Sequence, residues 1–303
     1  MHYILSITLG IFFCFSSVGS IAQTHQLSFE YANDLFTQTD QYYTQGIRLS
    51  YGSTTLNRAW LNRLMLKLPK PSSFAQSGIQ LKHEVFTPTD LGKGQVLPND
   101  RPYAGVLHIT WWHTQQDTLK QQSLTSAMHL GIIGPAAFAE GMQKTIHEVV
   151  NSEQPQGWDN QVAADLIVGY SLKYEKALLG NINHTHISGL AKVQLSTLIS
   201  SASVGARAHW NSPHWAQLRI QLYGVAYQSW VGYNATLQGG VFNTNSPHKL
   251  SNNQLERWLT SLTLGATLNY GKASIGYAWH YVSPEFIQAQ SHRWGALKIE
   301  IKF

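Results

Sequence analysis

Apolar and polar residues alternate along much of this chain, most clearly at its C-terminal end. Within residues 293–303, alternate positions are apolar, namely Leu297, Ile299, Ile301 and Phe303. The positions between them are charged, namely Lys298, Glu300 and Lys302. Because successive side chains of a strand point to opposite faces, this pattern predicts a strand with one face in lipid and one toward a polar interior. An amphipathic edge strand of a soluble β-sandwich is the alternative interpretation.

The period-two pattern recurs, clearly in some segments and weakly in others. It gives twelve candidate strands, which lie at or within 27–31, 47–51, 79–85, 107–111, 122–134, 161–174, 184–197, 199–212, 218–222, 255–270, 272–283 and 293–303. An open sheet edge in hydrocarbon would leave backbone groups unpaired, at a cost of several kcal/mol each. An even number of strands allows the sheet to close. The predicted fold class is therefore all-β, a transmembrane antiparallel up-and-down barrel of twelve strands.

The lengths of the connections predict which end of the barrel faces outward. With both termini in the periplasm, the outer loops are 34–43, 87–102, 135–160, 198–199, 229–254 and 284–291. Most of them are long. The predicted periplasmic turns near 115–121, 175–183, 213 and 271 are short, as is typical of bacterial outer-membrane barrels.

Two connections carry a helical period. In the third outer loop, residues 136–150 predict a short helix with an apolar stripe of Phe138, Met142, Ile146 and Val149. On the periplasmic side, 55–76 predicts a short amphipathic helix, with Leu56, Trp60, Leu64 and Leu66 roughly on one side. We interpret the second helix as one that rests on the inner rim or the membrane surface.

Composition agrees with a barrel. The 303 residues are 43% apolar and 12% aromatic but only 12% charged, about half the usual charge of a soluble domain. This balance disfavours a disordered chain. After the N-terminus no window approaches the ~18 consecutive apolar residues of a spanning helix. The net charge of +5 suits an anionic lipid surface and is too small to indicate a nucleic-acid partner.

The N-terminal residues 1–22 are expected to be a cleaved signal peptide. An apolar run from Tyr3 to Phe15 is followed by small residues at Ser20 and Ala22, which suit cleavage before Gln23. The single cysteine, Cys14, lies inside this segment, so the mature chain has no disulfide or thiol chemistry. A secreted chain of this size without disulfides indicates a bacterial envelope. Residues 23–303 would then form one outer-membrane barrel domain, which we expect to be monomeric.

Polar residues gather where predicted strands reach the outer leaflet. Asn33 and Asp34 end the first strand, Thr44 begins the second, and His147 lies on the helix of the third outer loop. A histidine base, a hard oxygen ligand and an amide donor beside lipid suggest hydrolysis of a lipid ester. The chain contains no serine elbow, phosphate-binding loop or zinc-protease motif.

Four sequence blocks, in order, carry a resemblance to a known family. They are Asn-Asp-x-Phe followed by Thr-Asp-x-Tyr-Tyr-Thr-x-Gly from residue 33, Arg-Pro-Tyr-Ala-Gly from 101, Gly-Pro at 134 before the helix with His147, and Gly-Trp-Asp-Asn-Gln from 157. This set resembles the lipid A 3'-O-deacylases, which are twelve-stranded outer-membrane barrels. The resemblance implies calcium-dependent removal of the 3'-linked acyl chain of lipid A, the lipid part of lipopolysaccharide.

The resemblance also implies roles for five residues. His147 would be the general base, because imidazole titrates near neutral pH. Asp34 would hold Ca²⁺, a cation that prefers oxygen ligands. Asn33 and Thr44 would contact the developing oxyanion. Glu153 would either orient His147 or complete the calcium shell, and both roles stay open.

Two alternative functions accompany this expectation, and the role of one residue stays open. One is an outer-membrane phospholipase, although no convincing serine nucleophile is present. The second is a non-enzymatic barrel, either a channel or a structural protein, whose narrow lumen is plugged by inward charges such as Arg48, Lys82, Glu84 and Arg219. The residue whose role stays open is Arg101, which would either tie loops together or contact a lipid A phosphate.

Overall fold

The computed structural model describes residues 25–303 except 38–40, 70–71, 152, 182–183 and 214. The predicted signal peptide 1–22, with Cys14, therefore lies outside the described residues.

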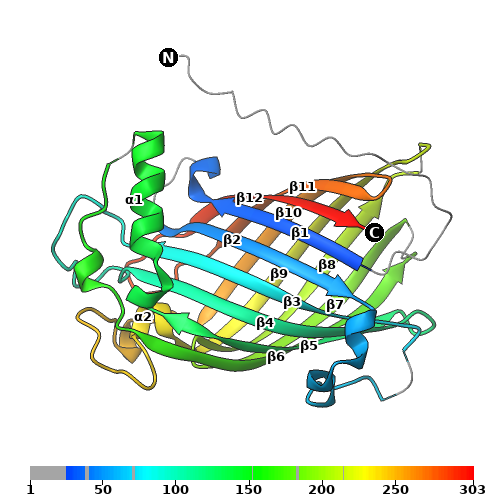
Figure 1. The fold of residues 1–303 in the computed structure, drawn as a ribbon, viewed down its shortest axis with the longest axis horizontal. Coiled ribbons are helices and arrows are strands. Elements are labelled where there is room, and N and C mark those ends of the chain that lie inside the picture. Colours follow the sequence, from blue (N-terminus) through cyan, green and yellow to red (C-terminus); the bar gives the residue numbers. More distant parts are fainter. Residues whose placement is uncertain (1–24, 38–40, 70–71, 152, 182–183, 214) are drawn as a thin grey trace.

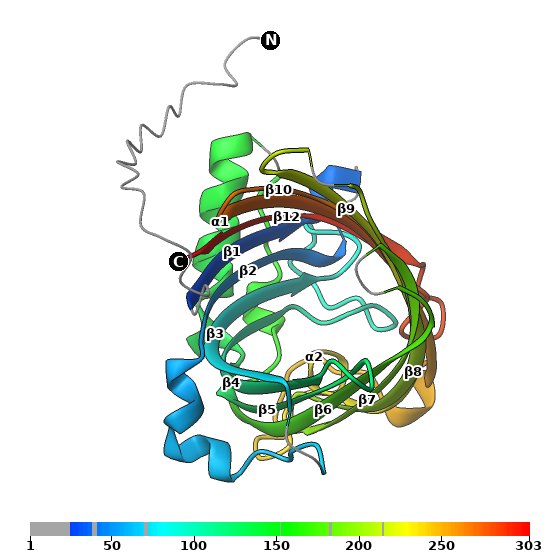
Figure 2. The ribbon, with the colours of Figure 1, turned by 90° about the vertical axis from the view of Figure 1, so that its right-hand side faces the viewer.

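Twelve strands form in the described part of the chain, as predicted. They are β1 (His25–Asn33), β2 (Tyr42–Ser53), β3 (Phe74–Thr87), β4 (Ala104–Asp117), β5 (Gln122–Ile133), β6 (Asp165–Gly180), β7 (Thr185–Ser196), β8 (Ile199–Asn211), β9 (Leu218–Asn234), β10 (Trp258–Tyr270), β11 (Ala273–Val282) and β12 (His292–Lys302). Each strand pairs with the next, and β1 pairs with β12, which closes the barrel (Figures 1 and 2). The pairing of β1 with both β2 and β12 is antiparallel. The predicted fold class is confirmed.

The two faces of the wall differ as the alternation predicts. Outward residues such as Phe29 and Ile299, which are register partners, are 45% and 51% exposed. Inward charges pair with one another: Arg48 lies 3.2 Å from Glu30, and Lys82 lies 2.6 Å from Glu84. The apolar face is thus left for lipid, and the inward carboxylates lie in ion pairs.

Short helices lie in the connections. They are η1 (Asp34–Thr37), η2 (Thr55–Arg58), η3 (Trp60–Arg63), η4 (Pro135–Ala137), α1 (Ala139–Val150), η5 (Trp158–Asn160), α2 (Ala235–Gln238) and η6 (Asn252–Gln254). We call the end that carries the termini and the β2–β3 and β4–β5 connections the turn end, and the opposite end, with α1, the loop end. Of the helices in the described ranges, none is long and apolar enough to cross a membrane.

The prediction of one short amphipathic helix within 55–76 is wrong in the type of helix and in its continuity. The segment forms η2 and η3, two turns of 3-10 helix separated at Ala59, whose backbone is extended. The Asn62 side chain donates a 2.8 Å hydrogen bond to the Leu56 carbonyl. Because the Leu56 carbonyl accepts from a side chain instead of from the next helical turn, a break is favoured over one continuous helix.

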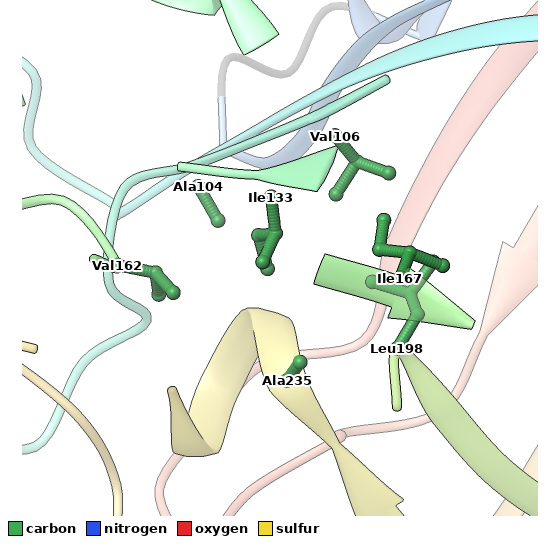
Figure 3. Packing of buried hydrophobic residues seen from close by; sticks show 7 residues of the cluster. All are labelled: Ala104, Val106, Ile133, Val162, Ile167, Leu198 and Ala235. Atoms are coloured by element: carbon green, nitrogen blue, oxygen red, sulfur yellow. The ribbon is translucent and has the colours of Figure 1, made fainter. Parts of the chain in front are cut away.

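Side chains fill the interior of the barrel at its loop end. An apolar cluster joins strand ends to the loop helix α2 and consists of Ala104, Val106, Ile133, Val162, Ile167, Leu198 and Ala235 (Figure 3). Beside it, Arg101 is 1% exposed, forms an ion pair with Glu285, and lies 4.9 Å from the ring centre of Phe86. Arg101 therefore ties the β3–β4 loop to the β11–β12 loop, the first of its two predicted roles.

Removing the partner of Arg101 should destabilise the barrel strongly. A buried cation that loses its carboxylate costs about 3–5 kcal/mol, so Glu285→Ala should lower the urea midpoint of unfolding in detergent. The control is Glu140→Ala, which breaks the exposed Lys144–Glu140 pair and should cost at most about 0.5 kcal/mol. Equal losses in both variants would contradict a buried ion pair.

Candidate functional site

The first part of the site lies where β1 passes into η1. Asn33 is buried; its Oδ1 accepts a 2.8 Å hydrogen bond from the Leu35 N–H, and its Nδ2 donates to the Tyr31 hydroxyl at 3.0 Å. This is the turn chemistry expected of asparagine. Asp34 is 1% exposed, and its Oδ2 accepts a 2.9 Å hydrogen bond from the Gln41 N–H. Both side chains are therefore fixed at the loop end of β1.

Thr44 occupies a β-bulge in the neighbouring strand. Tyr43 pairs with Phe86 and Gln45 pairs with Val85, so Thr44 is the extra residue between them. Its hydroxyl lies 2.7 Å from the hydroxyl of Thr87, and both groups are buried. A bulge re-aims the side chains at a strand end. Across the sheet, Gln45 pairs with Asn33, which brings β1 and β2 residues of the site together.

The third outer loop packs on the outside of the barrel wall. His83 Nε2 lies 2.9 Å from the Ala137 carbonyl oxygen, to which it donates. A buried cluster then joins the wall to the loop and consists of Val85, Leu91, Tyr103, Ala139 and Trp158. Figure 1 shows α1 running across the strands at the loop end. The loop is thus an outer layer over the strands that carry Thr44 and Thr87.

Helix α1 buries two of its polar side chains. Gln143 is 0% exposed and His147 is 5% exposed, whereas Phe138 and Val149, from the predicted apolar stripe, are 73% and 80% exposed. In water this arrangement would be unfavourable, but apolar residues facing acyl chains lose nothing by exposure. The helix therefore exposes apolar side chains near its two ends, whereas His147 in its last turns is buried.

His147 is oriented by the chain that follows α1. Its Nδ1 lies 2.5 Å from the main-chain carbonyl oxygen of Glu153. A carbonyl oxygen only accepts, so Nδ1 carries the proton, and Nε2 of the neutral ring keeps its lone pair. The Glu153 side chain is exposed, and its Oε1 would lie 2.1 Å from a Cβ placed on Gly92. Glu153 thus contacts His147 through its main chain.

Two buried amides are further candidates. Gln143 Oε1 accepts a 2.9 Å hydrogen bond from Trp158 Nε1. Its Nε2, like that of Gln45, is buried without a hydrogen-bond partner among the described residues. Unsatisfied buried donors are costly and mark places where a ligand oxygen would be stabilised. In the sequence, the spacing of four residues between Gln143 and His147 already indicated that they share one side of the helix. Nothing in the sequence indicated that Gln45, or Thr87 beside Thr44, would lie at the site.

The site residues thus form two groups on one wall. Asn33, Asp34 and Thr44 lie on β1, η1 and β2, and His147 is joined directly to Glu153. The groups meet through intermediates, since Thr44 contacts Thr87 at the end of β3, and β3 packs under α1.

The donors suit a hard cation in kind. The Asp34 carboxylate and nearby hydroxyl and amide groups are oxygen ligands of the type that Ca²⁺ takes. No group of three His, Cys, Asp or Glu side chains gathers in metal-binding proximity within the part of the chain that is described. Any cation here would therefore rely on Asp34 together with neutral oxygens.

The close packing of α1 against the wall at Gly105 can be tested by substitution. A Cβ on Gly105 would lie 2.5 Å from the Ala139 Cβ, so Gly105→Val should push the start of α1 off the wall. Overpacking costs about 1–3 kcal/mol, and trypsin cleavage after Lys144 should accelerate about tenfold. The control is Gly141→Ala, where a Cβ meets nothing within 4 Å; its cleavage should not accelerate. If Gly105→Val is cleaved at the wild-type rate, the helix is not held there.

Comparisons with known proteins agree with this architecture. The chain is similar to LpxR from Salmonella typhimurium, with 16% identity and a TM-score of 0.74, over 92% of this chain and 100% of that chain. It is also similar to the β domain of the Bordetella autotransporter BrkA, with 11% identity and a TM-score of 0.51, over 92% of this chain and 98% of that chain. Both likenesses show the barrel fold alone. No curated protein sequence matches.

The family itself is shown by the sequence. The profile described as "Outer membrane protein LpxR" matches residues 6–303, nearly the whole chain. This match places the barrel in the bacterial outer membrane, with its apolar outer face in lipid. The chain belongs to the LpxR family of outer-membrane proteins.

Proposed function

We propose that this barrel hydrolyses an ester of lipid A and releases the 3'-linked acyl chain in the outer leaflet. The observation that carries the proposal is His147, a buried histidine of α1 whose Nδ1 donates to the Glu153 carbonyl, on a helix that exposes Phe138 and Val149 near its two ends. A base on the outer wall of a membrane barrel lies beside lipid, so a lipid ester is the substrate within its reach. Membership of the LpxR family supports the same substrate.

The reaction needs one base and a set of donors. His147 Nε2 takes a proton from water as the water oxygen bonds to the ester carbonyl carbon. The negative charge that develops on the carbonyl oxygen is stabilised by amide donors such as Gln143 Nε2, with Asn33 and Thr44 as polar contacts. The carbon–oxygen bond to the sugar then breaks, and the sugar oxygen takes the proton from His147. The products are a fatty acid and a free hydroxyl on lipid A.

A cation fits this proposal as an aid to binding and polarisation. Asp34 would hold Ca²⁺, and the bound ion would supply Lewis-acid polarisation of the ester carbonyl. Glu153 acts in this proposal through its main-chain carbonyl, which keeps the Nδ1 proton of His147 in place. Its carboxylate is then free of any role in the reaction.

A channel is less well supported. The loop end is filled by the apolar cluster of Figure 3 and by the Arg101–Glu285 pair. A phospholipase remains the other hydrolase to test, and mass spectrometry of products from mixed phospholipid and lipid A separates the two activities.

The role of His147 is tested by substitution. Purified His147→Ala in detergent with lipid A and Ca²⁺ should release fatty acid at least about 100-fold more slowly, since a positioned base contributes about 10²–10⁴. The heat-modifiable gel shift should be unchanged, because the barrel does not depend on this side chain. Glu148→Ala, an exposed neighbour on the helix, is the matched control and should keep full activity. Full activity in His147→Ala would overturn the mechanism.

The role of Glu153 is separable from that of Asp34. Glu153→Gln preserves the main-chain carbonyl, so it should keep activity and the wild-type calcium requirement. Asp34→Asn removes a carboxylate and should raise the calcium concentration needed for half-maximal activity by tenfold or more, because Ca²⁺ affinity depends on the number of charged ligands. Calcium titrations of fatty-acid release measure both. An equal shift in the two variants would make the Glu153 carboxylate a ligand instead.

A further inference from the structure

The segment between β2 and β3 is built onto the outside of the barrel at the turn end. In Figures 1 and 2 it is the blue helical stretch that lies against the wall, at the end opposite α1. Asn62, which is 3% exposed, fastens it: its Nδ2 donates to Ser77 Oγ at 2.9 Å, and its Oδ1 accepts from Trp111 Nε1 at 2.9 Å. Residues 54–68, the docked segment, are therefore held in place by the wall.

The docked segment continues over two further strands. Ser126 Oγ, on β5, donates to the Leu66 carbonyl at 2.7 Å. The Leu66 N–H donates to the Tyr170 hydroxyl, on β6, at 2.9 Å. Met65 is 5% exposed beneath it. The segment thus covers the outer face of β3 to β6.

The register of the sheet places this layer relative to the lipid. The docked segment covers a row of outward polar residues, Ser77, His113 and Ser126, which pair across β3, β4 and β5 and are 0%, 4% and 0% exposed. Four positions further along the strands, the outward row is apolar and faces lipid, namely Leu81, Ile109, Leu130 and Val168, and these side chains are 44–65% exposed. At about 3.3 Å per residue, the segment lies about 13 Å from that row, at the edge of the apolar band.

The free face of the docked segment has the chemistry of a membrane interface. Three large apolar side chains point away from the barrel: Trp60, Leu64 and Leu66 are 67%, 56% and 57% exposed. Exposed cations lie among them, namely Arg58, Arg63 and Lys67, and none has an ion-pair partner among the described residues. Residues 54–68 contain no Asp or Glu. Aromatic and aliphatic groups beside unpaired cations suit the boundary between acyl chains and anionic headgroups.

We propose that the docked segment is an interfacial anchor that binds anionic phospholipid in the inner leaflet. Short turns and chain termini mark the periplasmic end of such barrels, so the leaflet beside this segment is the periplasmic one. Trp60, Leu64 and Leu66 enter the acyl region, and Arg58, Arg63 and Lys67 contact the phosphate groups. The anchor covers the outer faces of β3 to β6, and the other end of β3 carries Thr87, which contacts Thr44 of the candidate site.

The depth of the anchor is measured with a spin label. In a Cys14→Ser chain, Leu64→Cys is labelled and compared with Leu119→Cys, which lies in the β4–β5 turn and is 94% exposed. In vesicles of phosphatidylglycerol and phosphatidylcholine, the label at 64 should be more accessible to oxygen than to a water-soluble nickel chelate. The label at 119 should show the reverse. A label at 64 as accessible to nickel as that at 119 would place the segment in water and overturn the proposal.

The lipid preference is measured on the same protein. In native mass spectrometry, wild type should retain phosphatidylglycerol over phosphatidylcholine of equal chain length. The variant Arg58→Gln/Arg63→Gln/Lys67→Gln should lose this preference, about fivefold for each cation, from about 1 kcal/mol per cation at an anionic surface. The control Lys120→Gln/Lys176→Gln/Lys272→Gln removes equal charge outside the segment and should keep most of it. Equal losses in the two variants would refute a site in the docked segment.

Discussion

The need to pair every backbone group in a lipid environment is the constraint on which the rest of this structure depends. A sheet in hydrocarbon cannot leave an open edge, and the pairing of β1 with β12 removes the last one. Closure then dictates the alternation of side chains, since each strand must present one face to lipid and one to the lumen. It also confines irregular backbone to the two ends. The candidate site and the docked segment lie at those ends for this reason.

Polar groups on the outer wall must be shielded from lipid, and two segments of this protein shield them. At the loop end, α1 and its flanking loop pack on β3, whose Thr87 is 0% exposed, and bury the helix's own Gln143 and His147, which are 0% and 5% exposed. At the turn end, the docked segment covers Ser77 and Ser126. A polar group exposed to acyl chains would lose its hydrogen bonds to water without replacement. Both layers thus make polar chemistry possible on a surface that otherwise faces lipid.

The sequence blocks that resemble the lipid A deacylases have packing roles as well as chemical ones. Gly105 allows the helix to approach the wall, Gly157 lies against the Tyr103 ring, and Gly134 adopts a φ of +96° before η4. A side chain at any of these three positions would displace the loop that carries His147. Much of the motif therefore fixes where the histidine lies, which is why a block of residues, rather than one histidine, carries the resemblance.

The sequence by itself determined the strands, their number, the two faces of each strand and the helix in the third outer loop. These follow from a period of two, which is local and survives in any register that keeps the lumen polar. It also located Asn33, Asp34, Thr44 and His147 at one end of the barrel, through the order of loops and turns. What it could not determine was contact between residues distant in the chain.

Tertiary structure alone decided which atoms meet. The bulge at Thr44 depends on the register between β2 and β3, and the buried side of α1 depends on its packing against the wall and Trp158. Glu153 contacts His147 through a carbonyl that every residue possesses, so no side-chain pattern could reveal it. Arg101 finds Glu285 at a separation of 184 positions. Local periodicity encodes the wall, whereas packing of loops against that wall decides the geometry of the candidate site.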